Sequence, residues 1–172
     1  VGSEMCIRDS SYTGLRIGVS VAKGLCFGFG IPLIGIHTLD IMAATAIKQN
    51  RTAADCLYCA MLDARRMEVY AAIYDASLKL VRETTADIVE AETYASYLEK
   101  GKVCFFGNGA AKCKPVITSP NALFMEDIHP LAVNMIPLVE EAFAAGKFED
   151  TAYFEPAYLK DFVATAGRKK LF

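Results

Sequence analysis

The sequence predicts an α/β protein in which a β-sheet is covered by crossover helices. Hydrophobic residues make up 53% and charged residues 22% of the 172-residue chain, which is a globular composition. Alternating apolar and polar runs, typical of half-buried strands, occupy the middle of the chain. Segments with apolar residues at helical spacing lie before, between and after those runs.

The charge and hydropathy of the chain exclude several classes of protein. The net charge of −2 gives no bulk attraction to nucleic acid or to anionic lipid. The longest apolar stretch, residues 24–36, is too short for a membrane span and is interrupted by Pro32. Six cysteines without a visible export signal favour reduced, buried thiols. We therefore expect a cytoplasmic protein without a membrane partner.

The chain begins with ten residues that fit no structural pattern. Residues 1–10 show neither helical nor strand periodicity and do not begin with Met. They resemble translated adapter sequence, so we expect them to be foreign to the fold and the natural protein to extend further upstream. Helical spacing starts near Thr13, and Gly28 and Gly30 end that helix.

Two further elements precede a polar break. The apolar run at residues 32–36 suits a buried strand. Thr38 or Asp40 is expected to cap the next helix, which runs to about Lys48. The polar residues 49–52 then mark the expected domain boundary.

The second part of the chain opens with a β-hairpin. Residues 55–62 and 67–74 alternate in polarity and are joined by a short charged turn. The remaining predicted elements are a third strand at 77–83, a helix at 88–100, a strand at 102–106, a short helix, a strand at 122–125 and an amphipathic helix at 130–145.

The order of these elements suggests a particular layout. Three strands followed by alternating helices and strands, βββαβαβα, form the ribonuclease H-like unit of the actin-like ATPase superfamily. The helix, strand and helix before residue 52 match the last three elements of the same unit. We therefore expect one complete unit at 52–172 and the αβα remainder of a truncated first unit at 11–51.

Two motifs raise the question of metal or redox chemistry. Cys56 and Cys59 form a C-x-x-C, which can be a dithiol or half of a zinc site. Strand positions three apart point to opposite faces, so a pair of core thiols is the favoured interpretation. His37 and His129 have no metal-ligand spacing. We expect no catalytic residue, cofactor or metal from these motifs.

Two turns offer further alternatives. The G-N-G at residues 107–109 follows a strand and opens a helix, so its amides can cradle a phosphate. A tight turn is favoured, because the Lys and Ser/Thr of a phosphate loop are absent. Asp63 and Glu68, at the hairpin tip, can bind a cation, but a solvated turn is favoured.

The first helix carries the clearest pattern. Gly14, Gly18 and Ala22 form a ridge of small residues at four-residue spacing, which lets another helix approach closely. Apolar residues surround this ridge on more than one side. They are Leu15, Val19, Val21 and Leu25. The pattern leaves open whether the helix is buried in its own domain or contacts a partner.

The same segment resembles a known protein family. Residues 11–19 read SYTGLRIGV and are followed by AKGL, which resembles the signature of the TsaB family of tRNA threonylcarbamoyladenosine biosynthesis proteins. Three further pieces look similar and occur in the same order: residues 32–39, LDAR at 62–65 and EPAYLK at 155–160. The resemblance covers residues 11–172. The Gly-Pro-Gly that precedes the family signature is replaced by Arg-Asp-Ser at residues 8–10.

The resemblance implies a role in tRNA modification. The family has two ribonuclease H-like halves and works in the cytoplasm with a catalytic paralogue, TsaD, and an ATPase, TsaE. The complex transfers a threonylcarbamoyl group onto an adenosine beside the anticodon. By resemblance the chain is a non-catalytic scaffold, contacts tRNA only through the complex and needs no cofactor.

The resemblance also implies an interface. The family pairs with TsaD, or with itself as a homodimer, through helices of its first half. The implied interface residues are Thr13, Gly14, Leu15, Gly18, Val19, Val21, Ala22 and Leu25. The alternative hypothesis is an ATP-dependent enzyme of the same fold, of the small-molecule kinase type.

Overall fold

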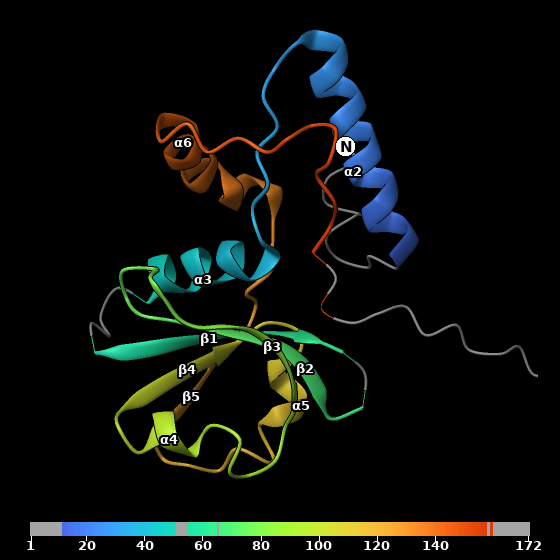
Figure 1. Ribbon diagram of the computed structural model, residues 1–172. Helices are drawn as coiled ribbons and strands as arrows, with labels where there is room; N and C mark the ends of the chain where they lie inside the picture. The colour runs from blue at the N-terminus through green and yellow to red at the C-terminus, as the bar shows by residue number, and fades with distance from the viewer. Residues whose placement is uncertain (1–11, 51–54, 65, 158, 160–172) are drawn as a thin grey trace, which may run out of the picture.

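A computed structural model of the chain describes residues 12–50, 55–64, 66–157 and 159 (Figure 1). The helices are α2 (Tyr12–Phe29), α3 (Thr38–Gln49), α4 (Ala95–Leu98), α5 (Ala110–Cys113), α6 (Ile136–Ala144) and the 3₁₀ helix η1 (Ala132–Met135). The strands are β1 (Cys56–Asp63), β2 (Glu68–Tyr74), β3 (Leu80–Ile88), β4 (Lys102–Phe106) and β5 (Ala122–Met125).

The strands form one mixed sheet in the order β3-β2-β1-β4-β5. The first three strands are antiparallel neighbours, whereas β4 and β5 join β1 in parallel after a helix each. The predicted α/β fold class and the predicted order of elements from Cys56 onward are confirmed. That residues 11–51 are the remainder of a first unit stays a prediction.

The central strand β1 is buried on both faces. Tyr58 and Ala60 belong to a cluster that α3 covers, whereas Cys59 and Met61 belong to a cluster on the side of α4 and α5. Figure 1 shows α3 on one side of the sheet and α5 on the other. The alternation of side chains along β1 thus divides the apolar residues between two cores.

Helix α3 is tied to the sheet by side chains of two strands. The Tyr74 hydroxyl donates to Asp40 Oδ1 (2.6 Å), and the Tyr58 hydroxyl donates to Asn50 O (3.3 Å). The predicted cap by Thr38 or Asp40 is wrong, because His37 is the N-cap and makes no side-chain capping bond. Asp40 uses its carboxylate to hold Tyr74 instead.

The strand predicted at residues 32–36 is wrong. In this run only Leu33 pairs, through an isolated antiparallel bridge in which the Glu149 N–H donates to Leu33 O (2.8 Å). Pro32 has no N–H to give to a ladder. The run is therefore an extended linker between α2 and α3 (Figure 1).

The third strand begins later and ends later than predicted. Asp75 Oδ1 accepts the N–H groups of Ser77 (2.8 Å) and Lys79 (3.0 Å), and this turn delays the start of β3 to Leu80. The far end of β3 continues to pair with β2, where Ile88 lies opposite Glu68. The predicted helix at 88–100 is consequently reduced to α4.

The last predicted helix is divided in two. Residues 132–135 form the 3₁₀ turn η1, and α6 begins only at Ile136, with Pro137 in its first turn. A proline in the first turn costs no helical hydrogen bond. Gly146, with a φ of +65°, ends the helix as expected.

Gly107 is expected to be essential for the junction between β4 and β1. Its φ is +99°, and a Cβ at this position lies 2.3 Å from Met61 O and 2.3 Å from Met42 Cε. Gly107→Ala should lower the free energy of unfolding by more than about 2 kcal/mol, since the backbone of β1 cannot move away without breaking the sheet. Urea denaturation measures this loss.

Gly101→Ala is the matched control for this variant, because its Cβ meets nothing within 4 Å. If Gly107→Ala and Gly101→Ala had equal free energies of unfolding, the close approach of Gly107 to β1 would be contradicted.

Candidate partner interface

Helix α2 lies outside the layers of the sheet (Figure 1). It ends at Phe29 because Gly30 takes a left-handed conformation with a φ of +63°. The Ile31 N–H then bonds Cys26 O (3.0 Å), which satisfies a carbonyl of the last turn. The other helices and strands of the described part make their more extensive contacts with one another and not with α2.

Neighbouring rows of side chains along α2 differ in exposure. Gly14, Gly18 and Ala22 are partly buried, as are Leu15 and Val19. The opposite pattern holds for three large side chains at four-residue spacing, which are more than half exposed. They are Ile17 at 59%, Val21 at 56% and Leu25 at 52%.

We call Ile17, Val21 and Leu25 the outer stripe of α2. The last turn of the helix carries two more exposed aromatic side chains, Phe27 at 85% and Phe29 at 74%. A contiguous run of large apolar side chains is uncommon on the surface of a soluble monomer and is typical of a protein contact. The outer stripe is therefore the best candidate for partner binding.

The predicted interface residues divide between these two neighbouring rows. Val21 and Leu25 lie on the outer stripe, whereas the small-residue ridge and its neighbours Leu15 and Val19 are partly covered. The side chain of Thr13 lies outside the described residues. Ile17 was missed, although its four-residue spacing from Val21 could have identified it.

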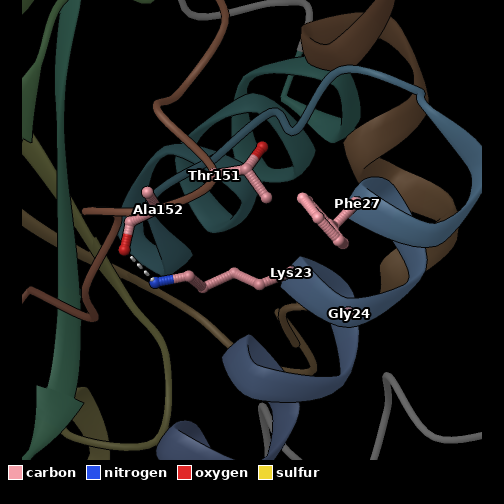
Figure 2. Close-up of a pocket in the computed structure, with 5 residues that line it drawn as sticks. All are labelled: Lys23, Gly24, Phe27, Thr151 and Ala152. Carbon is pink, nitrogen blue, oxygen red and sulfur yellow. Dashed lines mark hydrogen bonds between the residues drawn. The ribbon is translucent and has the colours of Figure 1, made fainter.

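Lys23 lies on the side of α2 that faces residues 151–154. Figure 2 shows its side chain extended toward Ala152, beside an open recess that also touches Phe27. The recess has a volume of about 290 Å³ and is lined by Lys23, Gly24, Phe27, Thr151 and Ala152. The Lys23 ammonium donates to Ala152 O (2.9 Å) and Phe154 O (3.0 Å). Among the described residues that line this recess, Lys23 carries the only charge, and that charge is engaged within the chain.

A lysine fills the hairpin tip that was considered as a cation site. The Lys112 ammonium donates to Asp63 Oδ1 and also to the carbonyl oxygens of Arg66 and Glu68, both at 2.7 Å. Asp63 and Arg66 are exposed, as expected for a solvated turn, and the bonds from Lys112 were not expected. The turn is held by an internal cation, which carries out the neutralising role that a metal ion would have.

The G-N-G turn is a tight turn, as favoured from the sequence. The Gly109 N–H donates to Met61 O (3.1 Å) and the Ala110 N–H to Gly107 O (3.1 Å). Asn108 Oδ1 accepts the N–H of Asp63 (2.9 Å). These amides are used within the fold, so they do not form a phosphate cradle.

The C-x-x-C is a pair of core thiols. Cys56 and Cys59 belong to the clusters on opposite faces of the sheet, as predicted. Burial raises the pKa of the Cys59 thiol well above its ordinary value. Among the described residues, no group of three or more His, Cys, Asp or Glu side chains is arranged to hold a metal ion. His37 and His129 are exposed and far from both thiols in sequence.

The described part of the chain contains no helix with the length and hydropathy needed to cross a membrane.

The buried thiols should resist alkylation in the folded protein. Cys59 and Cys104 should react with iodoacetamide at least about 100-fold more slowly than in the urea-unfolded protein, because they are buried and protonated. Mass spectrometry of proteolytic peptides measures the rates. Cys26, which is only partly buried, serves as an internal reference. Rapid labelling of Cys59 in the native protein would contradict a structural role.

Comparisons with known proteins identify relatives of this chain. Residues 11–166 match the family model described as "TsaD: tRNA N6-adenosine threonylcarbamoyltransferase". The tRNA threonylcarbamoyladenosine biosynthesis protein TsaB of Escherichia coli K12 is 32% identical over 161 residues, which is 90% of this chain and 68% of that protein. TsaB of Bacillus subtilis 168 is 33% identical over 110 residues, which is 62% of this chain and 46% of that protein.

Solved structures show the same fold. A crystal structure described as an uncharacterized protein with similarity to peptidase YeaZ from Pseudomonas aeruginosa superposes with a TM-score of 0.72 and 24% identity. YeaZ from Pseudomonas aeruginosa gives a TM-score of 0.69 and 23% identity. Each match covers 88% of this chain and 70% of the other chain. The curated relatives and the family model together show that the chain belongs to the TsaB (YeaZ) family, within the wider TsaD-related group.

Proposed function

We propose that this protein acts in the biosynthesis of threonylcarbamoyladenosine in tRNA as a non-catalytic subunit that supports the catalytic paralogue TsaD. The observation that carries the proposal is the outer stripe of α2, on a chain whose curated relatives are named for this biosynthesis. The protein works in the cytoplasm and meets tRNA only through the complex, which also includes the ATPase TsaE.

The energetics of α2 support a docking role. Burying a large aliphatic or aromatic side chain contributes about 1.5–3 kcal/mol relative to leaving it exposed. The outer stripe has no Lys, Arg, Asp or Glu at its three positions, so a partner helix can cover it without removing a charge from water. The three side chains at four-residue spacing form one ridge that fits the groove of a second helix.

Two features that could have suggested a ligand site are used within the described sheet. Lys112 holds the hairpin tip, and the amides that open α5 bond within the chain. These contacts support a binding role for the protein, and in this proposal the transfer chemistry belongs to the partner. A second copy of the chain can occupy the same stripe, so a homodimer would compete with the catalytic subunit for α2.

Val21→Asp tests the proposed interface. The protein expressed from its complete gene should co-purify with TsaD, and the variant should bind at least about tenfold more weakly, because a carboxylate in the middle of an apolar contact is desolvated without a partner. Isothermal titration calorimetry gives the two dissociation constants.

Val81→Asp is the matched control, since Val81 is 46% exposed on β3 and lies on the sheet rather than on α2. The control should bind as the wild type does. Equal binding by all three proteins would show that TsaD contacts another surface, and a wild-type protein that does not bind TsaD would contradict the proposed function.

A further inference from the structure

The back of helix α2 is held by a lysine clamp. Figure 2 shows the Lys23 side chain extended from α2 to the carbonyl of Ala152. Its ammonium donates to Ala152 O (2.9 Å) and to Phe154 O (3.0 Å), which lie 129 and 131 residues further along the chain. An ammonium has three donors and no acceptor, so one side chain can hold both carbonyls at once.

A carboxylate shapes the turn that presents these carbonyls. Asp150 Oδ1 accepts the N–H groups of Ala152 (2.8 Å) and Tyr153 (3.2 Å). The Phe154 N–H in turn donates to Asp150 O (2.8 Å). These N–H groups of the turn thus all donate to Asp150, and the carbonyl oxygens of residues 152 and 154 accept from Lys23.

The same segment is attached to the linker between α2 and α3. The Glu149 N–H donates to Leu33 O (2.8 Å). The Phe154 ring lies against Gly35 so closely that a Cβ there would be 2.9 Å from two ring atoms. Residues 149–154 therefore contact α2 on one side and the linker on the other, and they fix the helix relative to the segment that leads into α3.

Lys23 lies on the opposite side of α2 from the outer stripe. It is two residues from Val21 and two residues from Leu25, and each residue turns an α-helix by about 100°. The clamp therefore holds the back of the helix while Ile17, Val21 and Leu25 face outward. This arrangement explains why the stripe stays exposed instead of rolling onto residues 149–154.

We propose that Lys23 is a positioning residue, which sets the orientation of α2 for partner binding by holding the carbonyls of Ala152 and Phe154. The proposal rests on the proposed function, because it takes the outer stripe as the surface that the catalytic subunit contacts. Lys23 itself does not touch the partner. It acts through the angle at which α2 presents its apolar side chains.

Lys23→Met and Lys23→Arg test the clamp in the protein expressed from its complete gene. Methionine keeps the unbranched stem and removes the donors, whereas arginine keeps donors that reach two carbonyls. Lys23→Met should raise the dissociation constant for TsaD by about tenfold. Lys23→Arg should have a dissociation constant within about threefold of the wild type. Lys48→Met, at an exposed position near the end of α3, is the matched control and should change nothing.

Amide hydrogen exchange supplies the second readout. Lys23→Met should speed exchange in α2 and in residues 149–154, and it should leave β1 and β4 unchanged, which shows that the variant is folded. Asp150→Ala, which removes the side chain that shapes the turn, should shift binding and exchange in the same direction.

The outcomes separate the two proposals. If the wild type binds TsaD and Lys23→Met binds equally well, the positioning role is overturned and the proposed function stands. If Lys23→Met weakens binding but leaves exchange of α2 unchanged, Lys23 contacts the partner directly and positioning is again overturned. If the wild type does not bind, the proposed function fails and the positioning role fails with it.

Discussion

The alternation of side chains along β1 is the constraint on which most of this structure depends. The strand pairs with β2 on one edge and β4 on the other, and both of its faces are buried. Tyr58 therefore points into the cluster under α3, while Cys59 points into the cluster beside α4 and α5. The same strand supplies the carbonyl of Met61 that receives the G-N-G turn. Motifs that suggest redox or phosphate chemistry are consequently parts of a packed sheet.

Helix α2 is attached to the rest of the protein in a different way from the helices that cover the sheet. Among the described residues, long-range hydrogen bonds run from its Lys23 to two carbonyls, and it makes no extensive contact with the sheet. The side chains of its outer stripe stay on the surface. A helix of this kind contributes little to the core, and its sequence pattern is better explained by what it binds. In this account, the sheet provides the support, the clamp sets the angle, and the outer stripe makes the contact.

The sequence predicted those parts of the fold whose signals are local. The hairpin, β4 and β5 follow from polarity alternation and short apolar runs between turns, and α2 follows from helical spacing closed by Gly30. The strand predicted at residues 32–36 was wrong because an apolar segment does not reveal whether another strand lies beside it. The helix predicted at 88–100 failed because the pairing of β3 with β2 extended to Ile88 and competed with helical spacing.

The candidate interface was predicted only in part. The helix and two of its outer residues, Val21 and Leu25, were named from pattern and resemblance. Which side of the helix faces outward depends on the bonds from Lys23 to Ala152 and Phe154, and a contact across 129 residues leaves no local signal. The filling of the hairpin tip by Lys112 was missed for the same reason, since Lys112 follows Asp63 by 49 residues.

Reconstitution of the transfer reaction tests the central claim most directly. TsaD is incubated with the threonylcarbamoyl adenylate and tRNA, with and without this protein, and threonylcarbamoyladenosine is measured by mass spectrometry of the digested tRNA. The account predicts product only when both proteins are present, and none from this protein alone. Product formed by TsaD at the same rate without this protein, or product formed by this protein alone, would contradict the role of a non-catalytic supporting subunit.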